Sequence, residues 1–174
     1  EINDELLNGG LASIEKILAR SVEKGRIAQQ NKDAILDRIK GTTNIKDFSN
    51  CNIVIEAAVE NMDLKKKIFA ELDRICPLET ILATNTSVLS IIDVAMSTKK
   101  LDKVLGLHFF NPAPIMRLLE IVKTIATSDE TVETCREFGK SLGKTPVIAK
   151  DKPGFIVNRL LLPYMLHAVS LLEN

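Results

Sequence analysis

The sequence has 174 residues, of which 45% are hydrophobic and 26% charged, a composition typical of a globular domain with a substantial core. Its 23 Lys and Arg residues balance 23 Asp and Glu residues, so the net charge is zero and favours neither nucleic-acid binding nor binding to anionic membranes. No apolar run approaches the roughly 18 residues of a membrane span, and the N-terminus lacks a signal-peptide pattern. We therefore expect no nucleic-acid or membrane partner.

The three cysteines, Cys51, Cys76 and Cys135, are odd in number and far apart in the chain. They form no Cys-x-x-Cys pair, which argues against a disulfide framework and against a metal site. We interpret all three as packing residues of a protein in a reducing compartment. The expected location is the cytoplasm of a bacterium or archaeon, or the mitochondrial matrix in a eukaryote.

The first 40 residues have helical patterns. Apolar residues recur at three- and four-residue steps over residues 4 to 24, and Gly25 ends the pattern. A second helix is predicted over "NKDAILDRIK" (31–40), with Asn31 as its N-cap. After Gly41 the character changes to a β-branched run, "NIVIEAAV" (52–59), which predicts a strand buried on both faces.

Helical and strand patterns alternate over the following hundred residues. Helices are predicted over 62–75, 90–96 and 129–143, and strands over 80–84, 103–110, 117–122 and 145–149. This alternation predicts an α/β fold with a doubly wound, mostly parallel sheet. "GKSLGKT" (139–145) is one residue too short for a phosphate-binding loop and ends a helix, so we interpret it as a helix C-cap.

The last predicted helix begins near Phe155 and differs from the others, because it is apolar nearly all round. Such a helix has to be covered by other elements. We therefore expect residues 1–150 to form the α/β domain and residues 151–174 to begin a second, helical domain, with Pro163 as a kink.

Polar residues gather where three predicted strands end. In an α/β sheet, ligands bind beyond the carboxyl ends of the parallel strands. These positions hold Glu60, Asn85, Ser87, His108 and Asn111, which we expect to line one crevice. Each has a simpler explanation taken alone: Ser87 is a helix cap, and Asn111 forms a turn before Pro112.

His108 and Glu120 each lie six residues from Pro114, the centre of the loop between two predicted strands. If these strands pair as a hairpin, the two side chains face each other. A carboxylate in contact with an imidazole fixes its tautomer and favours the protonated ring, which suits a general base. The alternative is a structural hydrogen bond. Asn158, four residues after Gly154, is positioned to aim its amide at the same crevice.

Four stretches carry a family likeness: "VIEAAVENMDLKKKIFAELD", "ILATNTSVLSI", "GLHFFNPAPIMRLLEIV" and "DKPGFIVNRLL". In this order and spacing they resemble the 3-hydroxyacyl-CoA dehydrogenase family over essentially all 174 residues, and most closely its short-chain 3-hydroxybutyryl-CoA members. The resemblance implies a Rossmann-like domain and NAD-dependent, reversible oxidation of (S)-3-hydroxyacyl-CoA to 3-oxoacyl-CoA in fatty-acid or butyrate metabolism.

The resemblance also implies roles for individual residues. The expected catalytic residues are His108 as the base, Glu120 as its orienting carboxylate, and Ser87 and Asn158 around the substrate 3-oxygen. The expected cofactor-binding residues are Glu1, Glu60, Lys65, Asn85, Ser87 and Asn111. The expected contacts to the CoA part of the substrate are Arg20, Lys24 and Ser87.

The family pattern extends beyond this sequence at both ends. The resemblance places the first strand, the glycine-rich pyrophosphate loop and the first helix before Glu1, and most of a helical, dimer-forming domain after Asn174. We therefore expect a homodimer or larger homo-oligomer for the complete protein, and no dehydrogenase activity from residues 1–174 alone.

Two other classes of function remain to be compared with this one. A Ser–His–Glu hydrolase built on Ser87, His108 and Glu120 is disfavoured because no Gly-x-Ser-x-Gly turn surrounds Ser87. A non-catalytic relative or one that oxidises a sugar acid is the other alternative.

Overall fold

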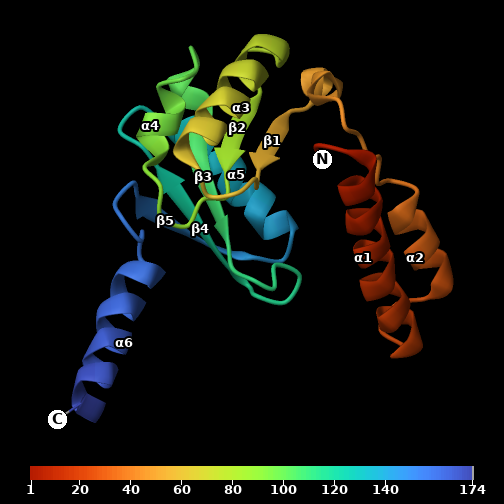
Figure 1. The fold of residues 1–174 in the computed structure, drawn as a ribbon. Helices are drawn as coiled ribbons and strands as arrows, with labels where there is room; N and C mark the ends of the chain where they lie inside the picture. The colour runs from red at the N-terminus through yellow and green to blue at the C-terminus, as the bar shows by residue number, and fades with distance from the viewer. Residues whose placement is uncertain (174) are drawn as a thin grey trace. The chain divides into compact units, whose positions relative to one another are not determined.

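The computed structural model describes residues 1–173 and divides the chain into two compact units, Glu1–Asp47 and a larger unit that begins at Phe48. The first unit is a pair of helices, α1 (Asp4–Glu23) and α2 (Gln29–Leu36) (Figure 1). The side chain of Asn3 caps α1 by accepting a hydrogen bond from the Leu6 N–H at 2.9 Å. Gly25, with φ of +65°, follows the end of α1 as expected.

Helix α2 begins two residues earlier than expected and ends at Leu36. Its N-cap is Ala28, which makes no side-chain hydrogen bond, so the assignment of Asn31 as the cap was wrong. The N–H groups of Asn31 and Lys32 bond to the Ala28 carbonyl, and the Gln29 amide donates to Asp33 at 2.8 Å. These local bonds extend the helix toward its N-terminus.

The larger unit is built on one sheet of five strands in the order β1-β2-β3-β4-β5. The strands are β1 (Ile53–Glu56), β2 (Ile81–Thr84), β3 (Val104–Phe109), β4 (Leu118–Lys123) and β5 (Thr145–Lys150). Strands β1, β2 and β3 are parallel, β4 is antiparallel to β3, and β5 is parallel to β4. The expected mostly parallel sheet and the hairpin-like pairing of β3 with β4 are confirmed.

Helices cover both faces of this sheet, which confirms the doubly wound architecture (Figure 1). Helices α3 (Met62–Ile75) and α4 (Ile91–Ala95) lie on one face, and α5 (Asp129–Ser141) lies on the other. Short 3₁₀ turns occur at Ile45–Asn50 and Leu101–Lys103. The layers are close: a Cβ on Gly106 of β3 would meet Ile91 of α4, and one on Gly139 of α5 would meet Leu119 of β4.

The α5 side of the sheet holds a core of fully or nearly buried side chains. These are Ile81, Ala83, Leu105, Leu107, Leu119, Ile121, Val132 and Cys135. The strand β1 lies at the sheet edge, and Ile55 is 36% exposed there. The expectation that residues 52–59 form a strand buried on both faces was therefore wrong: the strand is shorter, and its α5 face is only partly covered.

Helix α5 ends in a Schellman arrangement at Gly143, which has φ of +71°. The Gly143 N–H bonds to the Lys140 carbonyl, and the Lys144 N–H bonds to the Gly139 carbonyl. This confirms the interpretation of residues 139–145 as a helix C-cap.

Helix α6 (Val157–Glu173) continues through Pro163, and none of its described residues is buried. Leu160, Leu166 and Leu172 are 69–88% exposed. Among residues 1–173, no helix combines the length and apolar character needed to cross a bilayer. The division into an α/β domain and the start of a helical domain at residue 151 stays a prediction.

Candidate active site

The predicted site residues of the larger unit lie at or near the edge where β1, β2 and β3 end. Because these strands are parallel, the segments after Glu56, Thr84 and Phe109 leave the sheet on the same side. The β3–β4 register places His108 directly opposite Glu120. Both side chains are on the α3/α4 face, since His108 is two residues from Gly106, which faces α4.

His108 and Glu120 form a buried pair. The imidazole Nδ1 lies 2.7 Å from the Glu120 Oε2, and the residues are 4% and 1% exposed. A carboxylate at Nδ1 accepts a hydrogen bond from the Nδ1–H and keeps the proton on that nitrogen, so the lone pair of the neutral ring is on Nε2. Within the described part of the chain, Nε2 has no hydrogen-bond partner. The pair therefore presents a nitrogen that is free to take a proton from a ligand.

Two aromatic rings hold the imidazole in place. The ring centroids of Phe110 and Phe155 lie 4.5 and 5.6 Å from that of His108. Phe155 is 4% exposed, and it reaches the imidazole from the loop before α6. These rings restrict the orientation of His108 and exclude water from one side of it.

The second oxygen of Glu120 binds the N-terminus of α6. Its Oε1 accepts hydrogen bonds from the backbone N–H groups of Ile156 at 3.0 Å and Val157 at 2.9 Å. The chain reaches this position through two residues with positive φ, Gly154 at +75° and Phe155 at +48°. A Cβ on Gly154 would lie 2.9 Å from the Arg159 nitrogen, so the turn requires glycine.

Asn158 and Ser87 are in contact, as the spacing of Asn158 from Gly154 indicated. The Asn158 amide donates to the Ser87 carbonyl at 3.4 Å, and the Ser87 N–H donates to the Glu60 Oε1 at 2.9 Å. The Ser87 hydroxyl makes no hydrogen bond to residues 1–173. The structure thus brings together three of the predicted residues, Glu60, Ser87 and Asn158, and leaves this hydroxyl available.

Glu60 is ionised at neutral pH. Partial burial by itself would raise its pKa, but hydrogen bonds from Thr86 and Ser87 and the charge of Lys65 outweigh burial, so the pKa lies below the usual value. The Thr86 hydroxyl donates to Oε1 at 2.5 Å, and the side chain remains 38% exposed. Glu60 can therefore accept a hydrogen bond from a ligand at the crevice.

Lys65 is buried beneath this carboxylate. Its Nζ contacts both Glu56 oxygens at 2.8 and 3.0 Å, the Ala58 carbonyl at 3.2 Å and Glu60 at 3.5 Å, and the residue is 1% exposed. The sequence reasoning did not identify Glu56 as a partner. A single acidic residue inside the apolar run "NIVIEAAV" was the available signal, because a buried charge needs a counter-charge.

The two asparagines occupy different environments. Asn85 is half-buried and accepts a hydrogen bond from the Phe109 N–H at 2.8 Å, which joins the ends of β2 and β3. Asn111 is exposed in the loop after β3. Their roles as cofactor contacts stay predictions.

The remaining predicted ligand residues belong to the first unit. Arg20 is in the last turn of α1, Lys24 is its C-cap residue, and both are exposed. Glu1 is exposed, and its terminal amine donates to the Thr42 carbonyl at 2.9 Å. Two cations at a helix C-terminus also have a local explanation, because they interact favourably with the helix dipole. Their roles as ligand contacts stay predictions.

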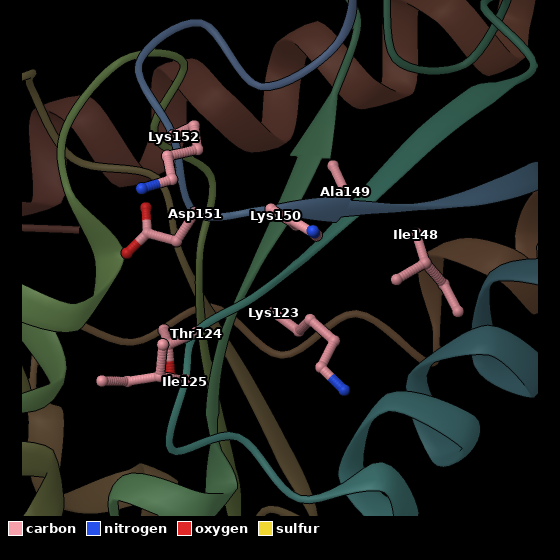
Figure 2. Close-up of a pocket in the computed structure, with 8 residues that line it drawn as sticks. All are labelled: Lys123, Thr124, Ile125, Ile148, Ala149, Lys150, Asp151 and Lys152. Carbon is pink, nitrogen blue, oxygen red and sulfur yellow. The ribbon is translucent and has the colours of Figure 1, made fainter.

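A cavity of about 540 Å³ lies at the other edge of the sheet, where β4 and β5 end (Figure 2). Its lining is Lys123, Thr124, Ile125, Ile148, Ala149, Lys150, Asp151 and Lys152. Figure 2 shows the amino groups of Lys123 and Lys152 pointing away from each other, so the lysines do not converge on one point. None of the predicted site residues lines this cavity.

Besides Glu56, three residues that shape the site were not predicted: Phe155, Thr86 and Asp151. Asp151 accepts hydrogen bonds from the backbone N–H groups of Ile91 at 3.1 Å and Ile92 at 2.8 Å, and so caps α4 from the loop after β5. Its partners are about 60 residues away, and no local pattern identifies such a contact. No group of three or more His, Cys, Asp or Glu side chains within residues 1–173 is arranged to hold a metal ion.

Comparison with protein families identifies the family of this chain. The model described as "3-hydroxyacyl-CoA dehydrogenase, NAD binding domain" matches residues 1–152. The chain belongs to the 3-hydroxyacyl-CoA dehydrogenase family. NAD is therefore the cofactor of this 3-hydroxyacyl-CoA dehydrogenase domain, and the family recognised from the four sequence stretches is confirmed.

Curated relatives support this assignment along nearly the whole chain. The 3-hydroxybutyryl-CoA dehydrogenase of Clostridioides difficile is 46% identical over 92% of this chain and 57% of its own length. The probable 3-hydroxybutyryl-CoA dehydrogenase of Bacillus subtilis is 41% identical over 97% of this chain and 59% of its own. The chain thus spans less than two thirds of these 3-hydroxyacyl-CoA dehydrogenase relatives.

Solved structures show the same fold. The (S)-3-hydroxybutyryl-CoA dehydrogenase PaaH1 of Ralstonia eutropha superposes with a TM-score of 0.97 at 41% identity, over 99% of this chain and 61% of its own. The 3-hydroxybutyryl-CoA dehydrogenase of Escherichia coli has the same TM-score and identity, over 99% of this chain and 37% of its own. The Rossmann-like fold of a 3-hydroxyacyl-CoA dehydrogenase is confirmed.

The chemistry of two predicted cofactor residues is compatible with NAD. Glu60 is ionised and partly exposed, so it could accept hydrogen bonds from ribose hydroxyls, and the exposed Asn111 could supply an amide. No buried side-chain atom of these residues is left unpaired among residues 1–173. The described strands carry no Gly-x-Gly-x-x-Gly turn, so this part of the dehydrogenase provides no pyrophosphate cradle of that type.

Proposed function

We propose that the protein catalyses the NAD-dependent, reversible oxidation of a short-chain (S)-3-hydroxyacyl-CoA, such as 3-hydroxybutyryl-CoA, to the 3-oxoacyl-CoA. The observation that carries the proposal is the buried His108–Glu120 pair, whose free Nε2 lies at the ligand-binding edge of the sheet. Its support is membership of the dehydrogenase family and the likeness to relatives that carry the 3-hydroxybutyryl-CoA dehydrogenase name.

His108 acts as the general base for the substrate hydroxyl. In the oxidation, Nε2 takes the proton of the 3-hydroxyl group, C3 loses its hydrogen as a hydride that NAD would accept, and the carbon–oxygen bond becomes a carbonyl. The ring becomes an imidazolium. Glu120 holds Nδ1 and balances the new charge. In the reverse direction the imidazolium returns this proton to the 3-oxygen.

Ser87 and Asn158 position the substrate 3-oxygen. The Ser87 hydroxyl donates to it, and Asn158 is held within reach by its contact with the Ser87 carbonyl. Hydrogen bonds to this oxygen stabilise the charge that develops on it during the reaction.

Glu60, Asn85, Asn111 and Ser87 bind the cofactor at the crevice, with Lys65 supporting Glu60 from below. NAD, when bound, supplies the hydride acceptor for C3. Glu1 is proposed to bind the adenosine ribose, and Arg20 and Lys24 to bind the CoA phosphates. The complete protein is proposed to be a cytoplasmic homodimer or larger homo-oligomer, or a matrix protein in a eukaryote.

The test is a His108→Gln substitution in the protein as its gene encodes it. Glutamine keeps a polar side chain but cannot deliver a proton to the 3-oxygen, so we expect kcat for NADH oxidation with acetoacetyl-CoA to fall by about 10²–10⁴-fold. NADH affinity, measured by fluorescence titration, should barely change. Near-normal turnover of the variant would remove His108 from the mechanism.

The same assay separates the alternatives. A non-catalytic relative would oxidise no NADH with acetoacetyl-CoA, and a sugar-acid dehydrogenase would reduce NAD with a hydroxylated sugar acid only. Residues 1–174 alone, assayed beside the protein as its gene encodes it, should show no activity. Equal activity of the two would place the pyrophosphate site within this chain.

A further inference from the structure

Ser87 is held at both of its backbone polar groups. Its N–H donates to Glu60 at 2.9 Å, and its carbonyl accepts from Asn158 at 3.4 Å. Its hydroxyl is free of hydrogen bonds to residues 1–173. The position of the Ser87 hydroxyl therefore depends on how Glu60 and Asn158 hold the Ser87 backbone. A shift of the Glu60 carboxylate would shift this hydroxyl.

Glu60 is exposed enough to move unless something fixes it, since 38% of its side chain contacts solvent. Thr86 provides the first constraint. Its hydroxyl donates to the Glu60 Oε1 at 2.5 Å and accepts from the Leu89 N–H at 2.9 Å and, more weakly, from the Val88 N–H at 3.4 Å. Thr86 is 1% exposed, so solvent water does not compete with its hydroxyl for the Glu60 carboxylate.

Lys65 provides the second constraint, from the opposite side of the carboxylate. Its ammonium lies 3.5 Å from the Glu60 Oε2 and is 1% exposed. Glu56, which accepts hydrogen bonds from the Thr84 hydroxyl at 2.7 Å and the Ala58 N–H at 2.5 Å, fixes the ammonium in turn. The Lys65 ammonium, held by both Glu56 oxygens and by the Ala58 carbonyl, is therefore a rigid anchor for Glu60.

We propose that Thr86 and Lys65 are positioning residues that fix the Glu60 carboxylate and, through it, the Ser87 hydroxyl. This inference rests on the proposed function of Ser87 as a ligand of the substrate 3-oxygen. Lys65 acts here through Glu60, because its ammonium is enclosed by Glu56, Ala58 and Glu60.

The chain offers a matched pair of threonines for the test. Thr80 and Thr86 flank β2 at its two ends, are 2% and 1% exposed, and each donates one hydrogen bond, Thr80 to the Cys51 carbonyl at 2.8 Å. Substitution of either by valine removes a buried hydroxyl, and Thr86→Val also removes the acceptor of the Leu89 and Val88 N–H groups. Only Thr86 contacts Glu60.

The experiment measures acetoacetyl-CoA-dependent NADH oxidation by the Thr86→Val, Thr86→Ser and Thr80→Val variants of the protein as its gene encodes it. We expect kcat of Thr86→Val to fall by about tenfold or more, because small misplacements of positioning groups are costly. Thr86→Ser keeps the hydroxyl and should restore turnover. Thr80→Val should retain wild-type kcat. A Thr86→Val variant as active as Thr80→Val would overturn the proposal.

A second readout does not depend on activity. In the wild type and in Thr80→Val, the Ser87 amide proton should be protected from hydrogen exchange by its bond to Glu60, and in Thr86→Val this protection should be lost. Unchanged protection in Thr86→Val would overturn the inference. An inactive wild type with the expected exchange pattern would instead contradict the proposed reaction, so the two failures are distinguishable.

If Thr86→Val does not fold, the Glu56→Gln/Lys65→Met double substitution replaces it. A buried ion pair can often be replaced by neutral residues of similar size without loss of stability. The glutamine still accepts from Thr84, but Glu60 loses the ammonium. We expect the same fall in kcat and the same loss of Ser87 protection, and a folded double variant with full turnover would contradict the proposal.

Discussion

At the scale of single residues, Glu120 serves two elements at once. One oxygen holds the His108 imidazole at 2.7 Å, and the other accepts the N–H groups of Ile156 and Val157. The residue is 1% exposed, and its charge is compensated by three donors and the positive end of α6. This double role links the orientation of the imidazole to the chain segment that carries Asn158.

Glu120→Gln separates these two functions. The glutamine oxygen can still accept from Ile156 and Val157, but its amide then donates to Nδ1 and forces the proton of the neutral ring onto Nε2. In that tautomer His108 cannot take the substrate proton, so we expect kcat to fall by about 10²–10⁴-fold in the protein as its gene encodes it. Steady-state kinetics with 3-hydroxybutyryl-CoA and NAD, the direction in which His108 takes the proton, measure this.

Glu137→Gln is the control for that substitution, because Glu137 is on the exposed side of α5, where it pairs with Lys140 at 2.6 Å. Its turnover should equal that of the wild type. Full activity of Glu120→Gln would show that the carboxylate does not determine the tautomer of His108.

At the scale of elements, the loop between β5 and α6 is tied to the rest of the unit at three points. Asp151 caps α4, Glu120 binds the backbone at Ile156 and Val157, and Asn158 contacts Ser87. Helix α4 has no side-chain cap of its own, since Ser90 makes no such bond. Asp151 therefore caps the short helix α4 from the loop that leads to α6.

Asp151→Ala should destabilise the unit by about 0.5–2 kcal/mol, because the Ile91 and Ile92 N–H groups lose their acceptor. Urea unfolding followed by circular dichroism measures the change. Asp93→Ala removes a carboxylate from the first turn of α4 that is exposed and caps no N–H group among residues 1–173. The Asp93 variant should therefore lose less stability. If both variants lost the same stability, the loss in Asp151→Ala would come from removing a negative charge near α4 and not from removing its N-cap.

At the scale of the whole molecule, the contact between α5 and the sheet determines how the larger unit responds to alkaline pH. Cys135 is fully buried between α5 and the sheet, and burial raises the pKa of its thiol to about 12. Burial also raises the pKa of the Cys76 thiol. In the unfolded chain both thiols ionise at lower pH than in the folded one, so alkaline pH favours unfolding.

The stability from the neutral Cys135 thiol is complete below the ordinary thiol pKa of 9.0 and is lost as pH rises toward 12. We expect the free energy of unfolding to fall by about 1.4 kcal/mol per pH unit in this window from this group. Urea titrations at about pH 8 and about pH 10 measure it. In Cys135→Ala the free energy of unfolding should decrease less between the two pH values, by about this amount. If the variant and the wild type showed the same decrease, Cys135 would not be its source.

Much of the fold and part of the site could be predicted because they depend on local pattern. The alternation of helical and strand patterns predicted the doubly wound sheet. His108 and Glu120 are equally far from Pro114 along the sequence, which predicted that they face each other. Gly143 and Gly25 marked helix ends because a positive φ is a local requirement. The predicted boundaries of α2 and β1 were wrong. In α2 the hydrogen bond from Gln29 to Asp33 supports an earlier start, and β1 lies at a sheet edge that is only partly covered.

The tertiary structure alone determined the partners of the buried charges. The second oxygen of Glu120 binds Ile156 and Val157 across 36 and 37 residues, and Asp151 reaches Ile91 across 60. Such contacts arise only when packed elements exclude water and each buried charge has to find a donor among whatever lies beside it. The sequence by itself determined the order of helices and strands and the opposition of His108 and Glu120. The packing of β4, α4 and α6 decided how Glu120 and Asp151 are held, because that choice depends on neighbours in space and not on spacing along the chain.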